Sequence, residues 1–193
     1  ADTSESFEVS NGAWLQDASS SYSWTMDAAG TPSGSTGPLA AFDGVNYMFT
    51  ESSGNYGATS SLINDCIDLS AWTDPAIVMA YHMYGAAMGT LDVDVSTDGG
   101  ATWTNAWTIS GDQGDVWNEA VVSLSAYSGQ ISARISGTTG TGFTSDMAID
   151  LVRLMEAPTA GCMDPFADNY DATATIDDGS CLYTGCTDPN ATN

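Results

Sequence analysis

Short apolar runs separated by turn-forming residues recur along the first 157 positions of the chain. Residues 76–84 (AIVMAYHMY) are almost entirely apolar, which predicts a strand buried on both faces. Residues 91–96 (LDVDVS) alternate between apolar and polar positions, as a half-buried strand does. The same reasoning predicts strands at 102–110, 116–124, 130–136 and 147–155. No segment keeps the apolar spacing of an amphipathic helix, so the pattern predicts an all-β sandwich.

The pattern changes after residue 157. Residues 156–161 (EAPTAG) form a Pro/Gly linker, and the text beyond it contains six Asp, no Lys or Arg, and three of the four cysteines. The stretch GCMDPFADNYD at 161–171 recurs as GCTDPNATN from Gly185, an offset of 24 residues. We therefore expect one domain at 1–157 and an acidic repeat region at 158–193, with a full copy at 161–184 and a second copy starting at 185. A repeat that stops part-way predicts that the chain is a fragment of a longer protein.

The charge of the chain is strongly one-sided. It has two Arg (Arg134 and Arg153), no Lys and 25 acids, for a net charge of -23. Nucleic-acid binding needs clustered cations, so we expect no nucleic-acid partner. No apolar run approaches the roughly 20 residues that span a bilayer, so we expect no membrane insertion. The start of the chain lacks a basic-then-apolar segment, which predicts that a signal peptide is absent or already removed.

The acids themselves are unusual, because twenty of the 25 are Asp rather than Glu and most lie in loop-like text. Asp in loops favours turns and calcium ligation. The alternative is that these acids simply keep the chain soluble in a salty exterior.

The most distinctive stretches of the first region are YHMYGAAMGTLDV (81–93), GDQGDVWNEAVVSL (111–124) and SDMAIDLVRL (145–154), after an opening FE at 7–8. Together they resemble the MAM domain (the meprin, A5 protein and receptor phosphatase module) in the version found in secreted bacterial proteins. The resemblance implies a jelly-roll β-sandwich of two antiparallel sheets that is extracellular and non-catalytic, and that serves in adhesion or partner binding. Animal MAM domains carry cysteines near the FE motif, whereas here only Cys66 lies in the domain, so their disulfide pattern is not carried over.

The resemblance also implies a bound cation. In MAM-like jelly rolls a cation can tie the amino-terminal strand to a loop and to the last strand. The matching acids are Glu8, Asp43 and Asp150, and Asn11 or nearby carbonyls would complete a calcium shell. The alternative is that Asp150 is a capped strand-end carboxylate and Glu8 is solvated.

The tail resembles short GCTDPxAxNYDxxATxDDGSC repeats that occur in tandem in secreted bacterial proteins and look distantly like the calcium-wrapping thrombospondin type 3 repeats. The resemblance implies a small, loop-rich unit closed by a Cys162–Cys181 disulfide, with Cys186 opening the next copy. A second possible calcium site comprises Asp164, Asp168, Asp171, Asp177 and Asp178. Their spacing is not that of an EF-hand loop, and a solvated spacer is the alternative.

Catalysis is not expected. His82 is the only histidine, which excludes zinc sites of the H-E-x-x-H type, and it lies in a strand-like run that favours packing. Asp92 and Asp94 share one face of a strand, but this looks like a solvated face rather than a glycosidase pair.

Two tryptophans next to turns, Trp72 and Trp103, are the candidates for an exposed aromatic that contacts a sugar ring, although ordinary packing is the alternative for both. We expect a secreted, extracellular or cell-surface binding module that attaches to a glycan or surface, with structural Ca²⁺. The alternative function is a protein–protein interaction or spacer module of a secreted protease or adhesin, without glycan binding.

Overall fold

The computed structural model describes residues 3–184. The chain divides into two compact units, Ala1–Glu156 and Ala157–Asn193. Residues 3–184 contain strands and loops but no helix, and hence no helix that could cross a membrane.

The first unit is built from eleven strands within the described residues. They are β1 (Thr3–Glu5), β2 (Leu15–Gln16), β3 (Thr25–Asp27), β4 (Tyr47–Thr50), β5 (Thr59–Asp68), β6 (Pro75–Met83), β7 (Thr90–Ser96), β8 (Thr104–Ser110), β9 (Trp117–Ser123), β10 (Gln130–Thr138) and β11 (Met147–Glu156). β6 to β11 correspond to the six strands that the apolar pattern predicts.

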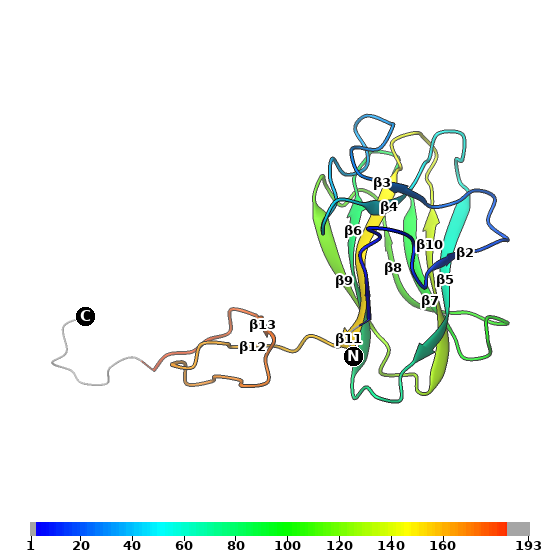
Figure 1. The fold of residues 1–193 in the computed structure, drawn as a ribbon. Coiled ribbons are helices and arrows are strands. Elements are labelled where there is room, and N and C mark those ends of the chain that lie inside the picture. The colour runs from blue at the N-terminus through cyan, green and yellow to red at the C-terminus, as the bar shows by residue number, and fades with distance from the viewer. Residues whose placement is uncertain (1–2, 185–193) are drawn as a thin grey trace. The chain divides into compact units, whose positions relative to one another are not determined.

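These strands form two antiparallel sheets packed face to face, as Figure 1 shows. One sheet has the order β3-β4-β11-β6-β9, with β1 paired to β11, and the other has the order β2-β5-β10-β7-β8. The core lies between them and includes, from β6 and β7, the side chains of Ile77, Met79, Tyr81, Met83, Leu91, Val93 and Val95. The predicted jelly-roll sandwich of two antiparallel sheets is confirmed.

β1 to β5 are not predicted by the apolar pattern. Four of them are only two to four residues long, so they carry too few positions for a period to be visible. β5 is longer but polar: its inward Ser60 is fully buried and its hydroxyl donates to the carbonyl of Tyr22 at 2.8 Å. A hydroxyl that finds a partner in this way is stable inside the sandwich, so the strand does not need apolar alternation.

The second unit is small and rich in loops. β12 (Ala160–Gly161) pairs in parallel with β13 (Ile176–Asp177). A disulfide joins Cys162 to Cys181. Closing a loop of this size contributes roughly 3 kcal/mol in the chain-entropy account, which suits a unit whose apolar core is so small. Gly185, Cys186 and the rest of the second copy lie outside the described residues, and Cys66 in the first unit is an exposed free thiol.

The outer faces of the two sheets differ. On the six-stranded sheet, Tyr47, Phe49 and Ala148 form a second buried cluster, against which Ala41 of the long loop at residues 28–46 and Trp117 pack. We call this the capped face. On the five-stranded sheet, the outward positions of β5, β7 and β10 are mostly polar. We call this the polar face, and define it by Thr59, Ser61, Asp92, Asp94, Arg134, Ser136 and Thr138.

Candidate functional site

Strand register brings the polar face together. Arg134 of β10 lies opposite Asp94 of β7. Ser136, two residues along β10, lies opposite Asp92 and, on the other side, opposite Ser61. Because positions two apart on a strand point the same way, these side chains project from one surface of the sheet.

An ion pair lies at the centre of this face. Nη2 of Arg134 donates to Oδ2 of Asp94 at 2.8 Å and Nε donates to the same oxygen at 3.2 Å. Asn105 donates from Nδ2 to the other carboxylate oxygen at 3.0 Å. The Arg134 guanidinium carbon also lies 4.5 Å from the centroid of the Trp103 ring. Charge-assisted hydrogen bonds and a cation–π contact therefore hold the guanidinium and the indole in one arrangement.

The hairpin between β7 and β8 positions Trp103. Asp98 accepts hydrogen bonds from the Thr102 amide at 2.9 Å, the Thr102 hydroxyl at 2.6 Å and the Ser96 hydroxyl at 2.7 Å. These bonds lower the pKa of Asp98 to about 2. Gly99 and Gly100 adopt φ of 71° and 86°, which side chains rarely adopt. Hydrogen bonds within the turn therefore hold its conformation. The turn reverses the chain direction, which places Trp103 against Arg134.

A hollow of about 320 Å³ lies beside the ion pair. This volume falls at the lower end of the range, about 300–1,000 Å³, of small-molecule sites. It is lined by Asp17, Ser19, Ser20, Thr59, Ser61, Asp92, Asp94, Arg134, Ser136 and Thr138. Three carboxylates and one guanidinium among hydroxyls favour a ligand rich in hydroxyl groups over an anionic one.

A second hollow, of about 220 Å³, lies further along β10 and includes Ser132, Gln130 and Asp65. Ser132, Arg134 and Ser136 are successive outward positions of that strand. Both hollows therefore include residues of β10, an arrangement that suits an extended ligand.

The two tryptophans singled out from the sequence have different surroundings. Trp103 is half-buried and its ring lies against Arg134 of the polar face. Trp72 is also half-buried, but it packs against the main core. Arg134 was not singled out, although one signal was available: it is one of only two cationic residues among 193 and occupies a polar position of an alternating strand.

Two acids of the expected cation site, Asp150 and Glu8, accept hydrogen bonds from one loop. Oδ2 of Asp150 accepts the amides of Phe42 and Asp43, each at 2.9 Å. Oε1 of Glu8 accepts the amides of Val45 and Asn46 at 2.8 and 2.9 Å. The last strand and the amino-terminal segment are thus both tied to the loop at residues 42–46.

The pKa values of Glu8 and Asp150 are shifted in opposite directions. Hydrogen bonds from the amides of Asn46 and Val45 lower the pKa of Glu8. Asp150 is fully buried, and this burial raises its pKa, with a smaller contribution from the charge of Asp43. The neighbouring Phe7 and Leu151 have φ of 58° and 45°, a region that costs energy for residues other than glycine. The backbone is therefore strained next to Glu8 and next to Asp150, as is common at functional sites.

Among residues 3–184, however, no three His, Cys, Asp or Glu side chains are grouped closely enough to hold a metal ion. In the first unit, amides occupy the carboxylate oxygens named above, and Asn11 uses its carbonyl to accept the Trp14 amide at 2.8 Å.

The acids of the second unit also make local bonds. Four of them accept the amide two residues further along, at 2.8–3.0 Å: Asp164, Asp171, Asp177 and Asp178. Asp168 accepts the Thr184 amide. A bond to the second amide along is the turn-forming role of Asp, so the first four acids shape local turns of the repeat, whereas Asp168 bonds a distant segment.

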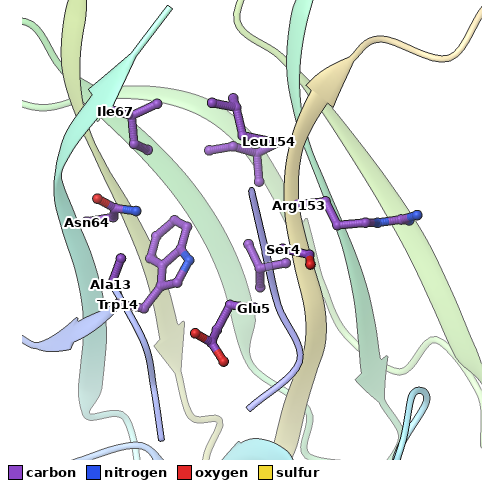
Figure 2. Close-up of a pocket in the computed structure, with 10 residues that line it drawn as sticks. Ser4, Glu5, Ala13, Trp14, Asn64, Ile67, Arg153 and Leu154 are labelled. Atoms are coloured by element: carbon purple, nitrogen blue, oxygen red, sulfur yellow. The ribbon is translucent and has the colours of Figure 1, made fainter. Parts of the chain in front are cut away.

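A further cavity of about 90 Å³ lies between the edges of the two sheets, where Figure 2 shows Trp14, Glu5 and Asn64 around it while Arg153 points away from Trp14. It is well below the roughly 300 Å³ at which small-molecule sites begin, and it has room for a few water molecules. This cavity is not a candidate for a glycan.

Comparison with known sequences identifies one family. The family model described as MAM domain, meprin/A5/mu, matches residues 6–161. The human MAM domain-containing glycosylphosphatidylinositol anchor protein 1 is 35% identical over 151 residues, which cover 73% of this chain and 16% of that protein. The chain thus spans about a sixth of the length of this curated relative.

Comparison with solved structures gives matches at the level of the fold. The K1 cleaved adhesin domain of Lys-gingipain from Porphyromonas gingivalis W83 has a TM-score of 0.57 and 19% identity, over 81% of this chain and 98% of that one. A xylan-binding domain from CBM 22 has a TM-score of 0.51 and 14% identity, over 80% of this chain and 94% of that one. At such identities the likeness concerns the sandwich alone.

Proposed function

This chain belongs to the MAM domain family, and from that membership we propose that it is a non-catalytic, secreted or cell-surface module that binds a neutral glycan on its polar face. The Arg134–Asp94 pair beside Trp103, next to a hollow lined by hydroxyls, is the observation that carries the proposal.

The chemistry of a neutral sugar suits this face. A pyranose offers neighbouring hydroxyls that both donate and accept, which a carboxylate and a guanidinium side by side can bond in pairs. Its C–H face suits the indole of Trp103. A net charge of -23 repels polyanions, so an uncharged polysaccharide is the favoured class.

Analogy at the level of the fold supports this choice without establishing it. By their own names, one structural neighbour is a xylan-binding domain and another an adhesin domain. The non-catalytic part of the proposal rests on the family.

Calcium forms the structural part of the proposal. Glu8, Asp43 and Asp150 belong to three segments that meet at the loop of residues 42–46. Residues 3–184 have two arginines, and each is paired with another acid, Asp94 or Glu119. A divalent cation bound by these acids, with Asn11 or nearby carbonyls, would relieve the repulsion between Asp43 and Asp150 at the cost of a local shift of the loop. The same proposal extends to the tail acids, where a solvated spacer is the alternative.

The proposal is tested by retention of the chain on a panel of neutral and acidic polysaccharides, with Ca²⁺ and with EDTA. We expect retention on a neutral member and none on acidic ones. Trp103→Ala should weaken binding about tenfold, the loss of roughly 1.4 kcal/mol of ring contact. Trp72→Ala provides the comparison, because a larger effect there would move the ligand site to Trp72. No retention in either condition would overturn glycan binding and favour the protein-contact or spacer role.

A further inference from the structure

The capped face has a hollow of its own, of about 270 Å³. It is lined by Pro38, Leu39, Ala40, Ala41, His82, Asp115, Val116 and Trp117. The indole of Trp117 donates to the carbonyl of Ala40 at 3.0 Å, which fixes the loop to the edge strand β9. The walls are therefore mainly apolar, and one carboxylate, that of Asp115, lies among them.

Asp115 and His82 form the polar part of this hollow. Nε2 of His82 lies 3.3 Å from Oδ1 of Asp115, whose side chain is 55% exposed. Burial lowers the pKa of His82, and the Asp115 charge raises it by less. Apart from this imidazole, no cationic side chain of residues 3–184 pairs with Asp115, because both arginines pair with other acids.

Large apolar side chains surround the hollow and are open to solvent. Leu39 is 82% exposed, Val116 55% and Phe42 45%. Phe42 contacts the ring of Trp117, with 6.1 Å between the ring centroids, so the patch is continuous with the hollow. Exposed apolar residues that gather in this way mark interaction surfaces more often than isolated ones do.

We propose that this hollow receives a lysine or arginine side chain of a basic protein partner, with the aliphatic stem along Leu39 and Val116 and the cationic head at Asp115. An apolar hollow with a carboxylate among its lining residues complements a side chain with an apolar stem and a charged tip. The exposed patch around it would then be covered by apolar residues of the same partner, and this interface is independent of the glycan site on the opposite sheet.

Charge decides against a second copy of this chain as the occupant. The chain has no lysine, and its two arginines, Arg134 and Arg153, are paired with Asp94 and Glu119 at 2.8 and 2.6 Å. Two copies would also bring together net charges of -23 each. A partner with free basic residues removes both obstacles.

The experiment titrates the full chain with N-acetyl-arginine methylamide or N-acetyl-lysine methylamide at physiological salt. The amide and imidazole NMR signals of the chain report binding. N-acetyl-norleucine methylamide, which has a similar stem and no charge, is the control probe. We expect the cationic probes to shift the amides of Leu39 and Val116 and the ring signals of His82, and the neutral probe to bind more weakly.

Asp115→Asn should weaken binding of the cationic probes about fivefold, as expected for one partly exposed ion pair, while leaving the spectrum of a folded chain. Asp74→Asn removes the same charge from an exposed loop elsewhere and should change nothing. Equal binding of the neutral probe, equal loss in both variants, or shifts confined to the polar face would each overturn the proposal.

Discussion

The two outer faces of this sandwich show how one scaffold produces two surfaces. Behind both faces lies the same apolar core, yet β6 turns Ala76, Val78, Ala80 and His82 outward and buries all four, whereas β10 turns Arg134 and Ser136 toward the polar face. The loop at residues 28–46 contributes to this difference, because it packs over the part of the six-stranded sheet around Ala148 and Trp117. A covered face can be apolar, and an uncovered face must satisfy its polar groups by hydrogen bonds among neighbours or with a ligand.

The largest expected difference between the capped face and the polar face is the loss of stability when a charged residue is introduced into each. Ala148→Asp introduces a carboxylate into the buried cluster of Tyr47 and Phe49, opposite the buried His82. We expect a loss of about 3–5 kcal/mol in the free energy of unfolding. Thr138→Asp on the polar face should cost within about 1 kcal/mol, because water reaches that position. Urea unfolding of both variants measures this, and equal losses would show that the faces do not differ in burial.

Calcium should act on the loop that covers the capped face. If it binds Glu8, Asp43 and Asp150, a Ca²⁺ concentration a hundred times the dissociation constant adds about 2.7 kcal/mol to the stability. Thermal unfolding in Ca²⁺ and in EDTA reports the shift. Asp43→Asn should reduce the Ca²⁺-dependent part, and Asp65→Asn, on the other sheet, should leave it unchanged. If the melting temperature is the same in Ca²⁺ and in EDTA, the calcium proposal is wrong, and amide hydrogen bonds alone hold this loop.

Arg134→Met tests the organisation of the polar face. Methionine keeps much of the apolar contact with Trp103. It removes the two hydrogen bonds from Arg134 to Asp94, which keeps the bond from Asn105. We expect a loss of about 1–2 kcal/mol in stability, together with weaker glycan retention. Chemical unfolding and retention on the polysaccharide panel measure the two effects separately. Unchanged retention would place the glycan away from the ion pair.

The smallest effect should be the dependence of the capped face on pH. Burial lowers the pKa of His82 in the folded chain below its ordinary value of 6.5. The unfolded chain therefore takes up the proton first, so the contribution of His82 to stability is complete above pH 6.5 and is lost as the pH falls toward the folded pKa. Melting temperatures between pH 7.5 and 5 should show this decline, and His82→Gln should lessen it. The same slope in the variant would assign the decline to other groups.

Much of the fold could be predicted from the sequence, because β6 to β11 bury one or both faces and show this in their apolar spacing. The short strands β1 to β4 could not, since they are held by their neighbours rather than by a pattern of their own. For the site, adjacency to a turn singled out Trp103, but it also singled out Trp72, which packs on the core. Nothing local in the sequence distinguishes these two positions.

The sequence by itself determined the sandwich, the acidic tail and the absence of any surplus of cationic residues, since these depend on composition and on spacing along one strand. Only the tertiary structure decided what the polar residues do. Arg134 and Asp94 are 40 positions apart, and they meet because β10 and β7 are neighbours in register. Loop 28–46 packs on the outer face of the six-stranded sheet and not on the polar face, because its position also follows from the strand order. Contacts between distant segments depend on strand order, which the spacing within any one strand does not encode.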